Sequence, residues 1–195
     1  MGISTQDIQQ LRETLGVGVM DAKKALQDAN GDMKQAELIL KEKGAKSAEK
    51  RADRATSEGY VGSYVHSNGK EAGLVALACE TDFVALTDSY KDLAHDLALH
   101  VVAAKPKYMR PEEVPAEVLT EKETIWKKQL AAEGKPEKML ENILKGKREK
   151  YFSEVCLLKQ PFVKDDSQTI EQFVTAAIAK FGENIQITGF TVLSL

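Results

Sequence analysis

The sequence predicts an α+β protein: an N-terminal three-helix bundle, then a core of a small three-stranded antiparallel sheet with helices and a helical hairpin. Three observations support this prediction. Apolar residues first recur at helical spacing, two strand-like runs then flank an Asn-Gly pair, and long amphipathic segments follow. The expected boundaries are 1–45 for the bundle, 46–58 for a charged linker, and 59–195 for the core, with the hairpin at about 112–151.

Three short helices are expected in residues 1–44, because apolar residues recur there three and four positions apart. Ser4 caps the first helix, which ends at Gly16-Val17-Gly18. The second follows directly, and Asp32 caps the third, which continues until Gly44. Each helix has one apolar face, so the three should pack into a compact bundle.

The segment from Lys46 to Arg54 is dense in charge, with small residues between the charges. It is interpreted as a solvated connector, helical or loosely ordered. The alternative is a contact with RNA or phosphate. That contact would require the basic residues to lie on one face, because basic runs bind polyanions only in that arrangement.

The hydrophobic period then changes to that of strands. The runs Tyr60–His66 and Gly73–Cys79 flank Asn68-Gly69, the strongest short signal for a hairpin, since a type I′ turn needs positive φ at both central residues. The second run is apolar on both faces, which predicts a central strand covered on each side. Residues 185–192 should form the third strand.

Amphipathic segments supply the helices of the core. One is expected at 90–102, where it covers a face of the sheet. Two more, at 116–132 and 137–151, are separated by Gly134-Lys135-Pro136, where glycine closes one helix and proline begins the next. This pair should form an antiparallel helical hairpin. A last helix is expected at 168–180.

Composition and charge exclude several classes of protein. A net charge of −3 argues against a chain that binds nucleic acid directly. Two cysteines are too few for a disulfide scaffold, no apolar run is long enough to cross a membrane, and the N-terminus lacks the pattern of a secretion signal. We therefore expect a cytoplasmic protein that binds a protein or a small ligand.

Residues with catalytic or metal-binding chemistry do not form a recognisable set. The three histidines, His66, His95 and His100, lack the spacing of a helical zinc pair, and Cys79 lies in a strand where burial favours an inert thiol. An enzyme that depends on Cys79 or His66 would also need a base and an orienting partner. We expect no catalytic residue, no metal and no cofactor.

Thr81-Asp82-Phe83-Val84 places a carboxylate and a bulky aromatic directly between a buried strand and a helix. One interpretation is that Thr81 or Asp82 caps the helix while Phe83 packs in the core. The other is that Phe83 is an exposed anchor for a partner's pocket, since aromatic residues dominate interface hot spots. The pattern leaves both open.

Two longer motifs contain these residues and the start of the chain. They are LRETLGVGVMDAKKAL at 11–26 and CETDFVA at 79–85, and 134–136, 154–165 and 182–185 continue the series in order. In this order the motifs resemble those of elongation factor Ts, the family of exchange factors for the translational GTPase elongation factor Tu. Long members of that family carry two related core halves, and this chain has material for one.

The resemblance implies a ubiquitin-associated-like bundle that grips the GTPase, and a core whose Phe83 enters as a wedge near the nucleotide. Asp82 would position the wedge or repel neighbouring acceptors, and Thr81 and Val84 would hold the turn. The chain would then disturb Mg²⁺ and phosphate binding and release GDP so that GTP can bind. The alternative is an adaptor that binds protein through the bundle without affecting nucleotide exchange.

Further partner contacts are also implied by the resemblance. Arg12, Val19 and Met20 are the candidates for binding the GTPase domain, and Tyr64 and His66 are candidates for touching another domain. We also expect a homodimer formed through the core, because a thin sheet leaves an apolar face or an edge unprotected and a short member can take the second half from a twin.

Overall fold

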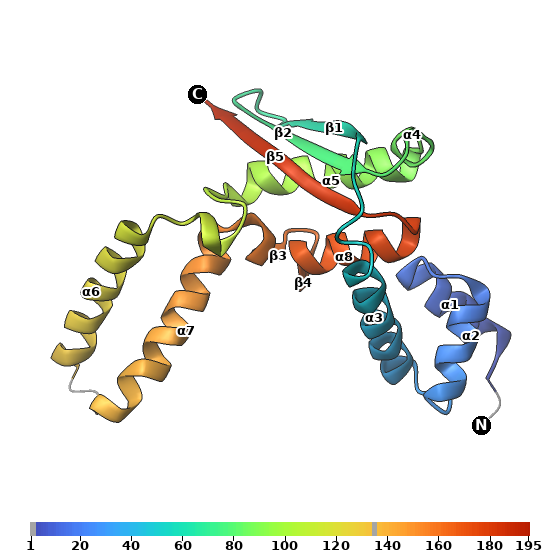
Figure 1. The fold of residues 1–195 in the computed structure, drawn as a ribbon, viewed down its shortest axis with the longest axis horizontal. Helices are drawn as coiled ribbons and strands as arrows, with labels where there is room; N and C mark the ends of the chain where they lie inside the picture. The colour runs from blue at the N-terminus through green and yellow to red at the C-terminus, as the bar shows by residue number, and fades with distance from the viewer. Residues whose placement is uncertain (1–2, 134–135) are drawn as a thin grey trace. The chain divides into compact units, whose positions relative to one another are not determined.

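The computed structural model describes residues 3–133 and 136–195, and Figure 1 shows its ribbon. The α+β prediction is confirmed. In chain order the elements are α1 (Thr5–Leu15), α2 (Val19–Asp28), α3 (Met33–Glu49), β1 (Glu58–Val65), β2 (Glu71–Cys79), α4 (Asp82–Ala85), α5 (Asp88–Ala104), η1 (Pro111–Glu113), α6 (Ala116–Ala132), α7 (Glu137–Val155), η2 (Leu157–Lys159), β3 (Pro161–Phe162), β4 (Asp165–Thr169), α8 (Ile170–Phe181) and β5 (Ile185–Ser194). Packing divides the chain into two compact units: residues 1–62, 76–94 and 172–188, and residues 63–75, 95–171 and 189–195.

The three N-terminal helices enclose an apolar core of their own. Ser4 caps α1 as predicted, and Gly16 ends it with φ 64°. The buried residues of this core come from all three helices: Leu11, Ala22, Ala25, Leu26, Ala29, Ala36 and Leu40. The prediction that Gly44 ends the third helix is wrong, because α3 continues to Glu49. Gly44 faces α8, where a Cβ would lie 3.3 Å from that of Ala179, so this glycine serves a close helix contact instead of a helix end.

The sheet has the strand order β1-β2-β5, so β2 is central as predicted. The hairpin at Asn68-Gly69 is confirmed, but the type I′ turn is wrong, because only Gly69 has positive φ, at 66°. The Oδ1 of Asn68 accepts a hydrogen bond from the backbone N–H of Lys70 at 2.9 Å. This contact satisfies the turn while Asn68 keeps an ordinary φ.

Helix α5 packs closely on one face of the β1-β2 hairpin. A Cβ on Gly62 would lie 2.3 Å from the carbonyl oxygen of Ala94, and one on Gly73 would lie 2.7 Å from Val102. On the other face, Leu74 is 44% exposed. The prediction that β2 is covered on each side is therefore wrong for the single chain.

In the second unit, α6 and α7 run antiparallel as the predicted helical hairpin (Figure 1). Arg148 of α7 donates to Glu123 of α6 at 2.5 Å. The predicted turn at Gly134-Lys135 lies outside the described residues. The short β3-β4 hairpin was not predicted, since neither strand has an alternating apolar pattern.

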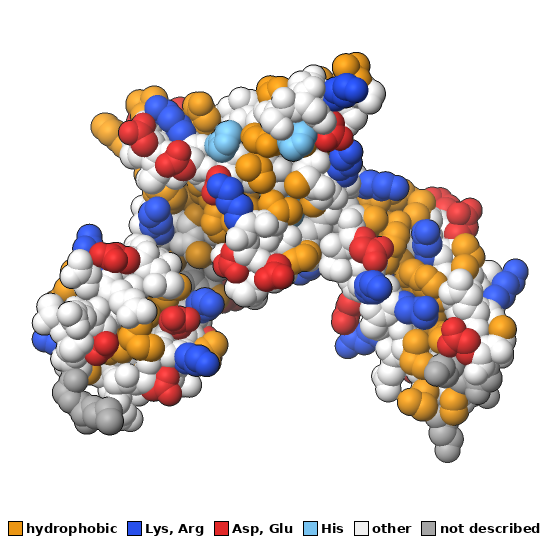
Figure 2. Space-filling view, turned by 180° about the vertical axis from the view of Figure 1, so that it is seen from behind, with side chains coloured by type: hydrophobic (Ala, Val, Ile, Leu, Met, Phe, Trp, Pro, Cys, Tyr) orange, Lys and Arg blue, Asp and Glu red, His pale blue; other side chains and the backbone are white. Residues whose placement is uncertain are grey.

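No helix in the described part of the chain is long and apolar enough to cross a membrane. On the face drawn in Figure 2, acidic and basic side chains are interspersed with exposed hydrophobic ones. The most exposed large hydrophobic side chains include Phe83, Met20, Leu193, Leu86 and Val65.

Candidate functional site

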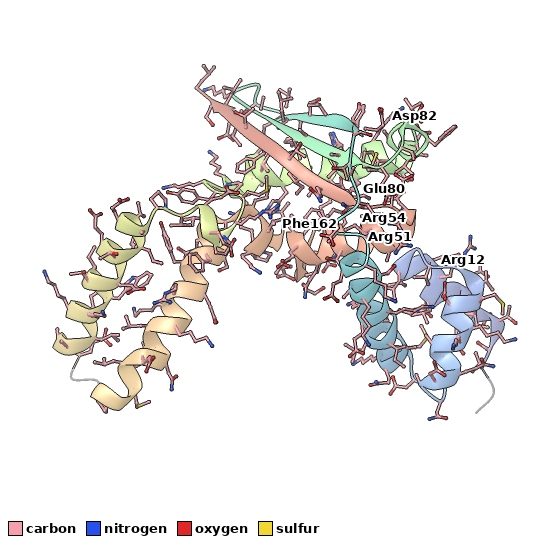
Figure 3. The ribbon with its side chains drawn as sticks, viewed as in Figure 1. Arg12, Arg51, Arg54, Glu80, Asp82 and Phe162 are labelled. Atoms are coloured by element: carbon pink, nitrogen blue, oxygen red, sulfur yellow. The ribbon has the colours of Figure 1, made fainter. Side chains whose placement is uncertain are left out.

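Phe83 lies on the single-turn helix α4, directly after the central strand β2. Its side chain is 82% exposed, and that of Leu86 is 67% exposed, whereas Ala85 between them is buried. The interpretation that Phe83 packs in the core is therefore wrong. Thr81 does occupy the N-cap position of α4, but its side chain makes no capping hydrogen bond to the helix. Asp82 begins α4 at the surface (Figure 3).

The Thr81 hydroxyl is engaged by a carboxylate that is distant in sequence. Glu183 Oε1 accepts from Thr81 Oγ1 at 2.6 Å, and Glu183 Oε2 accepts from the backbone N–H groups of Glu80 and Thr81, each at 3.1 Å. These three hydrogen bonds fix the backbone immediately before Asp82. The exposed aromatic therefore projects from a constrained loop.

Two buried side chains donate hydrogen bonds to backbone carbonyls in and before this loop. The Cys79 thiol donates to the carbonyl of Thr81 at 3.2 Å, and the Tyr90 hydroxyl donates to that of Leu77 at 3.0 Å. Burial raises the pKa of the Cys79 thiol and, well above its ordinary range, that of Tyr90. A thiol with a raised pKa is a poor nucleophile at neutral pH, which agrees with the prediction of an inert Cys79.

A second carboxylate, Glu80, joins the loop to the residues between the bundle and the sheet. Its Oε1 accepts from the backbone N–H of Asn184 at 2.6 Å. The buried Asn184 amide donates to the carbonyls of Ala52, at 3.2 Å, and Arg54, at 2.8 Å. Arg51 Nε donates to the carbonyl of Gly182 at 2.9 Å. Figure 3 shows Arg51, Arg54 and Glu80 where these segments meet.

The candidate residues of the bundle lie on either side of the turn at Gly16. Arg12 is exposed in the last turn of α1 (Figure 3). Val19 and Met20 begin α2 and are 53% and 75% exposed. An exposed cation and two exposed apolar side chains are residue types suited to binding a protein partner.

Tyr64 and His66 lie in the second unit, at the end of β1, and both are half-buried. The Tyr64 hydroxyl is 3.2 Å from His66 Nδ1. The Tyr64 ring makes an edge contact with the His95 ring, and the two ring centroids are 5.7 Å apart. His95 Nδ1 lies 3.0 Å from the carbonyl oxygen of Ser63. The two predicted residues therefore form one aromatic cluster with His95.

A comparison with known families decides the identity. The model of the family Elongation factor TS matches residues 12–195. The chain belongs to the elongation factor Ts family. It is therefore a translation elongation factor.

Elongation factor Ts proteins from several bacteria match almost the whole chain. That of Maridesulfovibrio salexigens is 49% identical over 195 residues, which cover 100% of this chain and 95% of the relative. That of Thermotoga petrophila is 48% identical over 191 residues, covering 98% and 95%. That of Heliobacterium modesticaldum is 47% identical over 188 residues, covering 96% and 87%.

Three residues that hold the loop, Glu80, Glu183 and Asn184, have no role predicted from the sequence. All three lie in family motifs, Glu80 in that at 79–85 and Glu183 and Asn184 in that at 182–185, and these motifs were the only signal for them. Their partners are about one hundred residues away along the chain, so no local period or spacing joins them. Within residues 3–133 and 136–195 there is no group of three or more His, Cys, Asp or Glu that could hold a metal ion.

Proposed function

We propose that this member of the elongation factor Ts family is a guanine-nucleotide exchange factor. It binds elongation factor Tu·GDP, disturbs the binding of Mg²⁺ and phosphate, and releases GDP so that GTP can bind. The observation that carries the proposal is Phe83, an aromatic side chain that is 82% exposed on a loop fixed by hydrogen bonds to Glu183. Burying such a side chain in a partner contributes roughly 1.5–3 kcal/mol to binding. An exposed aromatic side chain on a fixed loop is therefore suited to be an interface hot spot.

The mechanism needs no covalent step. GDP is held by Mg²⁺ and by backbone donors of a phosphate-binding loop, so moving the metal's ligands removes the charge neutralisation that holds the phosphates. Phe83 acts as the apolar wedge, and Asp82 positions it or repels neighbouring acceptors. Each tenfold loss of nucleotide affinity requires about 1.4 kcal/mol of differential binding. By reciprocity, bound GDP lowers the affinity of the GTPase for the exchange factor by the same factor.

The remaining parts of the chain provide docking. The bundle, residues 1–45, acts as a ubiquitin-associated-like domain that contacts the GTPase domain through Arg12, Val19 and Met20. Tyr64 and His66 touch another domain of the partner. We further propose that residues 46–58 link the bundle to the core, that two chains pair through their cores, and that the protein works in the cytoplasm, where translation elongation takes place.

The test is the rate at which mantGDP, a fluorescent GDP, leaves elongation factor Tu. With excess unlabelled GDP present, adding the chain should increase the release rate, and the rate should saturate with concentration. A pull-down of elongation factor Tu by the tagged chain runs in parallel. Capture without any change in the release rate would identify an adaptor and refute exchange activity.

A further inference from the structure

We propose that Glu183 is a positioning residue for nucleotide exchange. Its carboxylate holds the backbone of Glu80 and Thr81 in the orientation that presents Asp82 and Phe83 to the partner. This inference rests on the proposed function of Phe83 as the wedge. Glu183 itself is half-buried and acts through the loop that it binds.

The carboxylate is well matched to its three donors. The backbone N–H groups of Glu80 and Thr81 converge on Oε2, and the Thr81 hydroxyl donates to Oε1. An ionised carboxylate has acceptor sites for all three and no donor that would oppose them. Hydrogen bonds to a charged acceptor are about twice as strong as neutral ones.

Glu183 is itself held at a fixed point of the core. Gly182, with φ 74°, ends α8, and its N–H donates to the carbonyl of Ile178 at 3.0 Å. Asn184 follows at once and is 2% exposed. The acceptor therefore projects from a rigid junction between α8 and β5, which can fix a loop that lies about one hundred residues earlier in the chain.

The other contacts of the loop involve its carbonyl groups: the Cys79 thiol donates to that of Thr81 at 3.2 Å, and the Thr87 hydroxyl donates to that of Val84 at 2.8 Å. Helix α4 is four residues long, too short to be stable by its own hydrogen bonds, and Thr81 gives it no side-chain cap. Phe83 is 82% exposed, so packing within the chain does not hold it. Glu183 differs from these contacts because it binds the backbone N–H groups directly before Asp82, so the direction in which α4 begins depends on its carboxylate.

Glu183→Gln separates this role from a general effect on folding. The amide has nearly the same shape, but one oxygen is replaced by an NH₂ group, which would face a donor and cannot accept from it. The neighbouring bond from Asn184 N–H to Glu80 Oε1 remains. A matched control is Glu113→Gln, because Glu113 Oε2 also accepts from a backbone N–H, that of Met109 at 3.0 Å.

The experiment measures mantGDP release from elongation factor Tu across a range of chain concentrations. We expect Glu183→Gln to lower the maximal release rate about tenfold, which corresponds to the loss of about one charge-assisted hydrogen bond. The half-saturating concentration should stay within about twofold of the wild type. The melting temperature should fall by less than about 4 °C. Glu113→Gln should leave the maximal rate unchanged.

Amide hydrogen exchange in the free chain provides a readout that does not depend on elongation factor Tu. In Glu183→Gln the amides of Glu80 and Thr81 should exchange faster, while that of Asn184 should not change. Unchanged amide hydrogen exchange at Glu80 and Thr81 would overturn the proposal. Faster amide hydrogen exchange together with an unchanged maximal rate of mantGDP release would also overturn it. If the wild-type chain fails to accelerate mantGDP release, the proposed function is refuted. The amide hydrogen exchange of Glu80 and Thr81 would still show separately whether Glu183 holds their backbone.

Should Glu183→Gln unfold, Thr81→Val takes its place, because valine keeps the shape of threonine and removes only the hydroxyl that donates to Glu183. It should lower the maximal release rate with an unchanged melting temperature, and Thr81→Ser, which restores the hydroxyl, should recover it. A Thr81→Val chain that folds and releases GDP at the wild-type rate would overturn the proposal.

Discussion

The buried imidazole of His100 is paired through Nε2 with Oε1 of Gln160 at 3.0 Å. Its Nδ1 accepts from the backbone N–H of Val163 at 3.3 Å, so Nε2 carries the proton and the ring is neutral. Burial lowers the pKa of His100, and the bond to Gln160 opposes that shift only in part. Folding therefore favours the unprotonated ring.

This shift predicts how stability depends on pH. The unfolded chain binds a proton at His100 near the ordinary pKa of about 6.5, and the folded chain binds it only at lower pH. Between these two values the unfolded state holds more protons, so stability rises with pH and is lost as pH falls below about 6.5. We expect the free energy of unfolding in urea to drop by about 1 kcal/mol between pH 7.5 and 5.5.

The control is His100→Gln, which cannot take up a proton. Its stability should be lower overall but should vary less over the same pH range, so the difference in slope isolates His100. Parallel curves for the two chains would show that His100 does not cause the dependence.

Phe83→Ala tests the exposed aromatic. Because Phe83 is 82% exposed, its removal should change the melting temperature by only a few degrees. The maximal rate of mantGDP release should fall about 30-fold, which corresponds to the roughly 2 kcal/mol typical of a hot spot.

Phe162→Ala is the matched control for folding, because Phe162, which Figure 3 labels, is only 4% exposed by its solvent-accessible area. It should destabilise the chain by about 3–5 kcal/mol, as expected for a buried aromatic. A comparable loss of stability in Phe83→Ala would mean that Phe83 is buried in solution and is not a wedge.

Met20→Glu tests docking by the bundle. Met20 is 75% exposed, so the fold should tolerate the change. The half-saturating concentration for nucleotide release should rise about tenfold, because an apolar contact worth roughly 1.5 kcal/mol is lost, while the maximal rate is retained. Leu38→Glu, at a position 54% exposed on α3, is the control. Equal effects of both substitutions would argue against a contact centred on Met20.

Leu74→Lys tests the proposed homodimer. Leu74 is 44% exposed although it lies on the central strand, and Val61 and Val65 of β1 are 58% and 65% exposed. Sedimentation equilibrium at micromolar concentration should give twice the chain mass for the wild type and a single chain for Leu74→Lys, because a buried, unpaired ammonium is costly.

The control for the dimer is Val163→Lys, at a position of nearly equal exposure, 45%, outside the three-stranded sheet. It should sediment as the wild type does. A wild-type chain that sediments at one chain mass throughout the concentration range would refute the homodimer.

Local patterns in the sequence were enough to predict the main helices, the β1-β2 hairpin and their order along the chain, because these depend on hydrophobic period and on capping and turn residues, whereas the β3-β4 hairpin has no such pattern. Ser4 caps α1 and Asn68-Gly69 turns the hairpin as predicted. The family motifs also identified the loop at Thr81–Val84. Each of these signals acts over a few residues, and such signals survive in a single sequence without an alignment.

The surroundings of that loop depend on how distant segments pack, which the sequence pattern does not reveal. The sequence left open whether Phe83 is buried, because an aromatic residue after a buried strand can lie in the core or at the surface. In the folded chain its side chain is exposed at the surface. The carboxylate of Glu183 reaches Thr81 because α8 and β5 return the chain to the end of β2. Gly44 lies within its helix, where its missing side chain leaves room for Ala179 of α8. These outcomes depend on contacts between residues far apart along the chain, and no local pattern records such contacts.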